Sequence, residues 1–544
     1  MLTATHPRPV PAGAPTQTFP ERLTAVLAQS PDRAAVIEGD TALTYAELHD
    51  RATRVSAALR TLGVRPGDRV VTQLPNWWET VVASWAVFLT GAVLVPVVTI
   101  YRRRELAFVI DQVDARAVIT TGRYRGHDHA VTARSVLEEL GSPATVVTMR
   151  SGPDTRADDI LFEHLMTAGQ PDVEAASVHA DDIAVVLYTS GTTADPKGVL
   201  HSHRTLLAEV RDIASWCGLD ESARVFMGSP LSHITGLSYG ILLPVDLGGR
   251  VVLLDRWDAA DAVRVIEANA CTFTVSATPF LAELTDAYAK LDTRSSLRKF
   301  VCGGADIPTQ LVLRAHRTMG TRVLRTYGST ELPTSTMSDP AGDPDVEASA
   351  EGAPTGGNEI TIRPDQNGAN ELLVRAPELF LGYLDEALNA EAFDDDGWFR
   401  TGDVAHIDTD GRLRITGRIK DIINRGGEKF STAEVEAVLA DLPGVRDIAI
   451  VGYPDPLLVE RACACLVVDG PVPTLEQLRD AIVAAGLAIQ KSPEWVLLFD
   501  ELPRTPSGKI QRYLLRACAA DATAPARGRS LVPITQSRPE GNPS

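Results

Sequence analysis

The segment from Ile183 to Val199 reads IAVVLYTSGTTADPKGV. Its first half is an uninterrupted apolar run, which predicts a buried strand that ends at a turn. Its second half collects hydroxyl side chains, a glycine and one lysine behind a proline: Thr189, Ser190, Gly191, Thr192, Thr193, Pro196 and Lys197. Hydroxyls and backbone N–H groups at the end of a strand can surround phosphate oxygens, and the lysine adds positive charge. From these residues alone, a phosphate-binding loop and a Ser/Thr-rich surface loop are equally consistent.

Apolar strands alternate with helical runs on both sides of this segment. Helices are expected at residues 44–63, 203–218 and 258–270, and Thr44 is suited to cap the first of them. Buried strands are expected in the segments 68–75, 115–121, 145–149, 250–255 and 271–279. Such alternation is typical of α/β layers built on largely parallel sheets.

The pattern changes twice toward the C-terminal end. After Glu351, short strands separated by Gly- and Asp-rich turns predict a β-rich subdomain, and after Arg418 a smaller α+β pattern follows. We therefore expect the α/β class, with a large N-terminal domain of layered α/β subdomains plus the β-rich subdomain, and a small α+β C-terminal domain. The expected bounds are a disordered 1–18, a large domain 19–417, a small domain 418–518 and a flexible tail 519–544.

Composition argues against several classes of function. The 544 residues carry a formal net charge of −19, whereas nucleic-acid binding usually needs a basic face. The six cysteines include no C-x-x-C pair and the N-terminal residues lack a secretory apolar core, so a reducing cytoplasm is expected. The apolar stretch 80–101 is broken by Gly91 and Pro96, which predicts a buried helix and a buried strand instead of a membrane span.

Lysine is rare in this chain, with seven lysines among 52 Lys and Arg residues. Because arginine serves almost wherever a positive charge suffices, a lysine marks a position where a compact ammonium is wanted. Four of the lysines lie in motifs that carry chemistry: Lys197, Lys420, Lys429 and Lys509.

Four further segments carry side chains suited to nucleotide chemistry. RTYGSTE contains Tyr327, which can stack on a base, Thr330, which can reach phosphate, and Glu331, which can hold Mg²⁺. FRTGDVAHID places Asp403 after a glycine turn, where a carboxylate can accept ribose hydroxyls. GRIKDIINRGGEKF carries paired glycines, and PRTPSGKIQR places Lys509 in a loop bounded by proline and glycine. The alternative for Lys509 is a solvated surface lysine.

These five segments, in this order, resemble the adenylate-forming superfamily of acyl-CoA synthetases, firefly luciferases and peptide-synthetase adenylation domains. The resemblance extends from about Phe19 to Arg512. It implies roles for Tyr327 in stacking on adenine, Thr330 in binding phosphate and Glu331 in holding Mg²⁺. The implied phosphate-binding loop consists of Thr189, Ser190, Gly191, Thr192, Thr193 and Lys197.

The same resemblance assigns roles near the C-terminal end. Asp403 and Arg418 match the ribose contacts, and Lys509 matches the lysine that bridges the carboxylate and the α-phosphate. Lys420 falls at the hinge, which implies that the small C-terminal domain is mobile and turns after the first half-reaction. The turn along which pantetheine enters is matched by Gly426 and Gly427.

The implied reaction explains these residue types. A carboxylate attacks the α-phosphate of ATP, pyrophosphate leaves, and the thiol of CoA then displaces AMP from the acyl-AMP anhydride. Charge develops on phosphate oxygens, so catalysis is mainly positioning and electrostatics, with Mg²⁺ and Lys509 supplying most of it. Two residues depart from the family pattern: Ala194 replaces a loop glycine, and Thr432 replaces a common proline, as in the acetyl-CoA synthetase branch. We expect nucleotide binding to survive both changes.

The acyl pocket is expected between SPLSHITGLSYG and VCGGADIP. Its candidate residues are His233, Gly236, Tyr239, Gly303 and Gly304, and the glycines would leave room for a ring or a chain. The alternative for His233 is a hydrogen-bonded core histidine. LPNWWE, PLSHITG and CGGADIP are most similar to the branch of cyclohexanecarboxylate-CoA ligases and medium-chain acyl-CoA synthetases, which implies a cyclic, aryl or medium-chain acid.

The sequence leaves the acceptor of the acyl group open. The intact RGGEKFS turn favours CoA, whereas some relatives pass the adenylate to a carrier protein or an amine, and some in natural-product pathways activate nitrite and diazotise an aryl amine. An idle protein that kept the fold would have lost Lys197, Glu331 or Lys509, and all three are present. A kinase or P-loop ATPase would carry G-x-x-x-x-G-K-[ST], which does not occur. Relatives are often dimers, so a homodimer is one possibility that the resemblance raises, but no stretch of the sequence shows an interface and the oligomeric state stays open.

Overall fold

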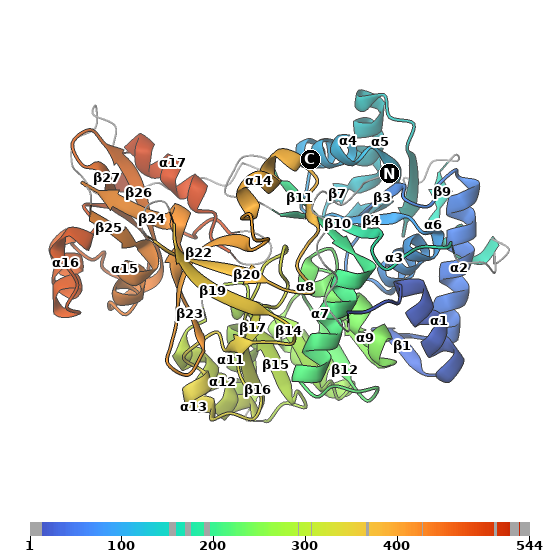
Figure 1. Cartoon of the computed structure of the whole chain (residues 1–544), viewed down its shortest axis with the longest axis horizontal. Coiled ribbons are helices and arrows are strands. Elements are labelled where there is room, and N and C mark those ends of the chain that lie inside the picture. The colour runs from blue at the N-terminus through green and yellow to red at the C-terminus, as the bar shows by residue number, and fades with distance from the viewer. Residues whose placement is uncertain are drawn as a thin grey trace. The chain divides into compact units, whose positions relative to one another are not determined.

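The structure of the protein is a computed structural model that describes residues 14–151, 159–168, 176–189, 196–291, 293–305, 307–365, 369–426, 428–504, 509–522 and 532–533. These residues fall into two compact units, and many of their elements are labelled in Figure 1. Unit 1 covers the described parts of Met1–Thr189, Asp195–Glu359 and Val374–Phe399. Unit 2 covers the described parts of Ile360–Leu373 and Arg400–Ser544.

The first sheet of unit 1 has eight strands in the order β21-β11-β10-β4-β3-β5-β8-β9. The six strands from β10 to β9 run parallel, whereas β11 and β21 are antiparallel to their neighbours. β10 is the apolar run predicted at the start of the phosphate-binding motif, and its central residues are buried. The strand bounds are β3 Arg69–Gln73, β4 Val93–Pro96, β5 Ala115–Thr121, β8 Thr145–Met149, β9 Ile160–Leu161, β10 Ile183–Thr189, β11 Lys197–Ser202 and β21 Gly382–Tyr383.

The second sheet of unit 1 has nine strands in the order β18-β17-β16-β15-β14-β12-β13-β1-β2. Its central six strands are parallel, and the edge strands β2, β17 and β18 are antiparallel. The bounds are β1 Ala34–Glu38, β2 Thr41–Thr44, β12 Arg224–Met227, β13 Arg250–Leu253, β14 Phe273–Ser276, β15 Lys299–Cys302, β16 Arg322–Tyr327, β17 Thr336–Met337 and β18 Ala353–Pro354. A separate two-stranded hairpin consists of β6 Arg123–Tyr124 and β7 His127–Asp128.

Helices pack against these two sheets. The helix predicted at 44–63 begins at Thr44, whose side chain accepts a hydrogen bond from the N–H of Glu47 in a capping box. The bounds of the helices of unit 1 are α1 Phe19–Gln29, α2 Tyr45–Thr61, α3 Trp78–Thr90, α4 Arg103–Val113, α5 His129–Leu140, α6 Phe162–Ala168, α7 His203–Trp216, α8 Ile234–Gly236, a π-helical η1 Leu237–Leu242, α9 Leu243–Leu247, α10 Ala259–Ala268, α11 Thr278–Leu291, α12 Thr309–Met319, α13 Pro344–Glu347, a 3₁₀ turn η2 Glu386–Leu388 and α14 Asn389–Ala392.

The apolar stretch 80–101 divides as predicted into a helix and a strand. α3 is buried on nearly all sides, which explains why its sequence is apolar all round. It ends at Gly91, whose φ of 74° suits glycine, and the buried strand β4 follows. Within the described part of the chain, no helix has the length and apolar character that a membrane crossing requires.

Unit 2 contains a four-stranded sheet and a mixed sheet flanked by helices. The four-stranded sheet has the order β19-β20-β22-β23, and the mixed sheet has the order β25-β24-β27-β28-β29, with β26 paired to β27. α17 packs on one face of the mixed sheet, and α15 and α16 pack on the other (Figure 1). Alternate residues of β27 enter these two cores, as the period of a strand requires. The bounds are β19 Glu359–Pro364, β20 Asn370–Arg375, β22 Phe399–Ile407, β23 Leu413–Arg418, η3 Ile419–Asp421, β24 Ile422–Arg425, β25 Glu428–Ser431, α15 Thr432–Leu439, β26 Val445–Asp455, β27 Val459–Val468, α16 Leu475–Ala484, η4 Ile489–Lys491, β28 Trp495–Leu498, α17 Arg512–Ala522 and β29 Val532–Pro533.

The compact units do not divide at the domain boundary expected between residues 417 and 418. The contacts divide the chain at Phe399 and Arg400 and group residues 360–373 with unit 2. The expected boundary therefore stays a prediction. Regular structure also extends into the ends that we expected to be disordered or flexible. Thr18 is buried and caps α1, and α17 continues to Ala522. Residues 1–13 lie outside the described part of the chain.

Candidate active site

The β10–β11 hairpin places the two ends of the predicted phosphate-binding loop opposite each other. Thr189 and Lys197 are paired in the antiparallel register, and both are half-buried. Lys197 therefore lies at a fixed position beside the last residue of a buried strand. The predicted loop residues Ser190, Gly191, Thr192 and Thr193, together with Ala194, lie outside the described residues.

A tight turn follows β16 and carries the next group of predicted site residues. Tyr327 is the last residue of β16, and the N–H of Ser329 donates to the carbonyl of Leu332 at 2.7 Å. A Cβ at Gly328 would lie 1.9 Å from the carbonyl oxygen of Pro333, so only glycine allows this close approach. The turn therefore presents Thr330 and Glu331 just beyond the carboxyl end of a parallel strand.

Tyr383 joins Glu331 to Lys197. Its hydroxyl donates to Oε1 of Glu331 at 2.7 Å, and Nζ of Lys197 lies 4.9 Å from the centroid of its ring. Burial and the neighbouring Glu331 carboxylate raise the pKa of the Tyr383 phenol, so the hydroxyl stays a donor. The structure thus brings together the predicted metal ligand and the predicted phosphate lysine through a residue that we did not predict.

The surroundings of Glu331 fit a metal held mainly by nucleotide. No hydrogen bond reaches its second oxygen, Oε2, from the residues that the structure describes. These residues also include no cluster of three or more His, Cys, Asp or Glu side chains that could form a metal cage. Mg²⁺ typically uses one or two carboxylates together with water and phosphate oxygens. A half-buried carboxylate beside the lysine that we predict to bind phosphate matches that donor set.

A small cavity opens at the carboxyl ends of β4 and β10. Ligands of open α/β sheets commonly bind at this edge. The cavity brings predicted His233 and Thr330 together. Its other lining residues were not predicted: Pro96, Val97, Val98, Tyr101, Leu187, Tyr188, Ser232 and Ile234.

Gln73 is hydrogen-bonded to the backbone of two residues that line this cavity. Its side-chain amide donates to the carbonyl of Val98 at 3.2 Å and to the carbonyl of Tyr101 at 3.0 Å. Gln73 is fully buried and its Oε1 is 3.2 Å from Nδ1 of His129. The 98–101 segment is therefore fixed by a buried polar contact, although it lies outside the regular strand.

Four other predicted pocket residues do not line this cavity. Tyr239 is buried, and its hydroxyl donates to Oε1 of Glu209 at 2.5 Å. A Cβ at Gly236 would lie 2.1 Å from the carbonyl oxygen of Pro230, and one at Gly303 would lie 2.6 Å from Cγ2 of Thr326. Close packing thus explains these two glycines without a ligand. Gly304 has a φ of 81°, which explains the glycine locally. Their assignment to the acyl pocket stays a prediction.

Glu209 belongs to a buried acidic cluster that we did not predict. It lies on α7 together with Asp212, and Glu378 approaches from another segment of unit 1; both glutamates are fully buried. Burial raises the pKa of Glu209 to about 8, and burial with the charge of Glu209 raises the pKa of Glu378 well above its ordinary value. Oε2 of Glu209 and Oε1 of Glu378 are buried without a hydrogen-bond partner among the described residues. The cluster therefore retains protons at a pH where exposed carboxyl groups are ionised.

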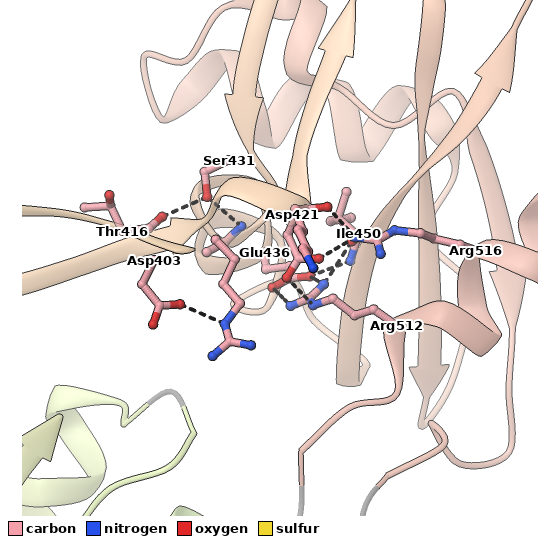
Figure 2. Close-up of polar contacts among 11 residues, drawn as sticks. Asp403, Thr416, Asp421, Ser431, Glu436, Ile450, Arg512 and Arg516 are labelled. Atoms are coloured by element: carbon pink, nitrogen blue, oxygen red, sulfur yellow. Dashed lines mark hydrogen bonds and ion pairs between the residues drawn. The ribbon is translucent and has the colours of Figure 1, made fainter. Parts of the chain in front are cut away.

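Unit 2 pairs the two predicted ribose contacts. Asp403 on β22 lies opposite Arg418 on β23 in the antiparallel register. Nε of Arg418 is 2.8 Å from Oδ1 of Asp403, a contact drawn as a dashed line at Asp403 in Figure 2. Asp403 is buried. The arginine thus orients the carboxylate that the prediction assigns to the ribose.

The predicted hinge residue Lys420 lies in η3, which is held by two arginines of α17. Arg516 donates to the carbonyl of Lys420 at 2.8 Å and is ion-paired with Asp421. Arg512 pairs with both Asp421 and Glu436, as Figure 2 shows. Because Lys509 lies three residues before the first residue of α17, these contacts connect the segment that follows the predicted catalytic lysine to the predicted hinge.

Ser431 connects β23 to α15: its hydroxyl donates to the carbonyl of Thr416 at 2.7 Å and caps α15 (Figure 2).

Gly426 directly follows β24 and has a φ of 62°, and its N–H donates to the carbonyl of Leu458 at 2.7 Å. Lys509 is half-buried, whereas its neighbours 505–508 and the predicted Gly427 lie outside the described residues. The positive φ explains the glycine at 426, and a role in binding pantetheine stays a prediction.

Comparison with known proteins identifies sequence relatives along most of the chain. The family model described as AMP-binding enzyme matches residues 23–384, and that of the AMP-binding enzyme C-terminal domain matches residues 434–509. A medium-chain fatty-acid–CoA ligase of Escherichia coli (strain K12) is 33% identical over 500 residues, covering 89% of this chain and 88% of the ligase. A salicylyl-CoA synthase / salicylate adenylyltransferase of a Streptomyces species is 34% identical over 506 residues, covering 89% of this chain and 90% of the relative.

A solved structure also superposes on this chain. The amide bond synthetase of Marinactinospora thermotolerans superposes with a TM-score of 0.80 at 29% sequence identity. The superposition covers 92% of this chain and all of the synthetase. The architecture of this chain is therefore shared with that synthetase over nearly its whole length.

Proposed function

The chain belongs to the AMP-binding enzyme family, and on that premise we propose that it activates a carboxylic acid with ATP, releases pyrophosphate, and transfers the acyl group from acyl-AMP to the thiol of CoA. It is an AMP-forming acid–thiol ligase, as the named CoA ligases among its relatives are. The observation that carries the proposal is the arrangement of Lys197 and Glu331 around Tyr383, because an ammonium and a carboxylate held close together are the groups that binding of a metal–nucleotide complex would use.

Each charged residue has a role in the adenylation step. When bound, Mg²⁺ would neutralise charge on the phosphate oxygens, and Glu331 is the side chain that would hold it. Lys197 and Thr189 would bind the phosphates, and Lys509 would bring the carboxylate to the α-phosphate. Fixed groups of this kind accelerate the reaction because they stabilise the developing charge without reorganising.

The remaining nucleotide contacts complete the binding site that we propose. Tyr327 would stack on adenine, and Thr330 would donate to phosphate from its tight turn. Asp403, held by Arg418, would accept the ribose hydroxyls. Loop residues Ser190, Gly191, Thr192 and Thr193 remain part of the proposed phosphate site.

We further propose that the acid is cyclic, aryl or medium-chain. Relatives named for medium-chain fatty acids and for salicylate support this choice. The cavity beside His233 is lined mostly by apolar and aromatic side chains, which suits such an acid better than a highly charged one.

CoA is the acceptor that we favour, with the turn at Gly426 and Gly427 guiding its pantetheine arm. The alternative acceptor is a carrier protein or an amine, including diazotisation of an aryl amine with nitrite. The structural likeness to an amide bond synthetase supports an amine as the alternative acceptor. A cytoplasmic location agrees with the supply of ATP and CoA and with six free cysteines. A homodimer is part of the same proposal and is tested by sedimentation.

A pyrophosphate-release assay over a panel of carboxylic acids, with and without CoA, tests this function. The panel should include medium-chain, alicyclic and hydroxy- or aminobenzoic acids, and one arm should supply nitrite with an aminoaryl acid. We expect acid-dependent pyrophosphate release that CoA accelerates, together with formation of the acyl-CoA. Turnover with nitrite but with no acid–CoA pair would refute the CoA-ligase assignment.

A further inference from the structure

We propose that Tyr383 is a positioning residue for adenylation, which orients the Glu331 carboxylate with its hydroxyl and seats the Lys197 ammonium on its ring. This inference rests on the proposed function, because it assigns Glu331 to the metal and Lys197 to the phosphates. Its basis is that one buried side chain contacts both groups, at 2.7 Å through the hydroxyl and at 4.9 Å through the ring centroid.

The backbone around Tyr383 is fixed on both sides. Asn389 accepts the N–H of Tyr383 at 2.7 Å and donates to its carbonyl at 3.1 Å. Tyr383 is only 6% exposed, and Asn389 is also buried. One side chain thus satisfies both backbone groups of the residue, so Tyr383 has little freedom to move.

The backbone of the segment 380–384 is hydrogen-bonded to Glu331 and to Gly198, the neighbour of Lys197. The N–H of Leu384 donates to the carbonyl of Gly198, next to Lys197, and the N–H of Phe380 donates to the carbonyl of Glu331, both at 2.8 Å. β21 is also paired with β11, the strand that begins with Lys197. The segment therefore fixes the distance between the lysine and the glutamate through the backbone as well as through the tyrosine.

Aromatic packing holds the ring itself. Phe380 meets the Tyr383 ring edge-on, with centroids 4.9 Å apart, and Phe380 is in turn packed against Phe393 and Phe399. A ring held in this way presents a defined face to the ammonium of Lys197. Cation–π attraction then favours the position seen here.

The arrangement keeps two opposite charges available for a ligand. Lys197 and Glu331 form no ion pair with each other in the described structure, although both contact the same tyrosine. A direct ion pair would occupy the carboxylate and the ammonium that metal and phosphate need. Tyr383 donates a neutral hydroxyl to the Glu331 carboxylate and presents its ring face to the Lys197 ammonium. Each charged group is therefore oriented without being neutralised by an opposite charge.

Two substitutions separate the two contacts. Tyr383→Phe deletes the hydroxyl but keeps the ring and its packing, whereas Tyr383→Leu deletes both. Tyr288→Phe is the control, because Tyr288 is also a buried tyrosine of unit 1 whose hydroxyl donates to a glutamate, Oε1 of Glu267, at 2.6 Å, and it is not among the proposed site residues. Its hydroxyl also accepts from Ser295, so the control removes at least as many hydrogen bonds as Tyr383→Phe does. Any general cost of removing a buried Tyr–Glu hydrogen bond is thus measured in the same unit.

Calorimetric binding of ATP to the full chain, in EDTA and in excess Mg²⁺, gives the readout without any acid substrate. For Tyr383→Phe we expect the Kd of metal-free ATP to stay within about twofold, because the ring still seats Lys197, and the Kd of MgATP to rise about tenfold. For Tyr383→Leu we expect both Kd values to rise, the metal-free one by about three- to tenfold. Tyr288→Phe should change neither.

The inference is overturned if Tyr383→Phe leaves MgATP affinity unchanged, or if it weakens ATP equally with and without Mg²⁺. If Tyr383→Leu fails to fold, the contrast between Tyr383→Phe and Tyr288→Phe decides alone. Wild-type protein that binds no MgATP would refute the proposed function together with this inference. Wild-type protein that binds MgATP and releases pyrophosphate, with an unaffected Tyr383→Phe variant, would refute only the role of Tyr383.

Discussion

Replacement of Glu209 by glutamine should stabilise unit 1 at alkaline pH. Glu209 is fully buried, and its Oε1 accepts a hydrogen bond from the Tyr239 hydroxyl at 2.5 Å. The groups that face it include Asp212 on its own helix and Glu378, which both disfavour a second negative charge. Glutamine keeps the shape and the acceptor for Tyr239 but cannot ionise, so it isolates the effect of the proton.

The sign and size of the effect follow from the pKa. The folded chain releases the Glu209 proton at about 8, compared with 4.5 for the unfolded chain, so the folded state binds more protons between these values. Stability is therefore complete below pH 4.5 and is lost as the pH rises through about 8. The whole shift corresponds to about 5 kcal/mol. Because the proton is shared within the cluster, we expect the substitution to recover about 2–4 kcal/mol at pH 9 relative to pH 5.

Urea unfolding of the full chain at several pH values between 5 and 9 measures this difference. The two units need not unfold together, so the transition of unit 1 is read from tryptophan fluorescence in a Trp495→Phe background, which removes the tryptophan of unit 2. Glu138→Gln, at an exposed position on α5, is the control and should follow the wild type. An identical pH slope for Glu209→Gln and wild type, or a less stable Glu209→Gln at pH 9, would refute the reasoning.

Three further substitutions test other parts of the structure. Lys509→Ala should slow adenylation by about 10²–10³-fold while sparing thioester formation from supplied acyl-adenylate, measured by pyrophosphate release and by acyl-CoA formation; equal loss of both half-reactions would contradict its role. Asp421→Asn should destabilise unit 2 by about 1–3 kcal/mol in urea, because Arg512 and Arg516 lose a charged partner, and an unchanged midpoint would count against the clamp. Gly328→Ala should lower the thermal midpoint and ATP affinity together, since its Cβ would lie 1.9 Å from the Pro333 carbonyl oxygen, and wild-type ATP binding would show that the turn can open.

Local patterns in the sequence predicted the elements that carry the site. The apolar run before Thr189 forms β10, and Thr44 caps α2 with a capping box. The stretch 80–101 forms a buried helix and strand because Gly91 ends α3 with a positive φ. Each of these outcomes depends on residues close together in the chain, where periodicity and capping preferences act directly.

Contacts between distant segments could not be predicted in this way. Tyr383 and Glu331 are 52 residues apart, and only the pairing of β21 with β11 brings the tyrosine to Lys197. Glu209 lies on the apolar, buried face of α7, and a carboxyl group at such a position of a helical pattern could have been noticed in the sequence. The approach of Glu378, in contrast, is set by tertiary packing. Gly236 illustrates the converse, because the glycine interpreted as room for a ligand is also required by the nearby backbone of Pro230.

Transfer of oxygen from the acid to AMP tests the central claim most directly. The enzyme is incubated with ATP, Mg²⁺, CoA and an accepted acid labelled with ¹⁸O in its carboxylate, and AMP is analysed by mass spectrometry. Attack of the carboxylate on the α-phosphate followed by cleavage at the acyl carbon leaves one carboxylate oxygen on AMP, so we predict AMP carrying a single ¹⁸O. Label found in inorganic phosphate with ADP as the nucleotide product, or AMP without label, would contradict the acyl-adenylate mechanism.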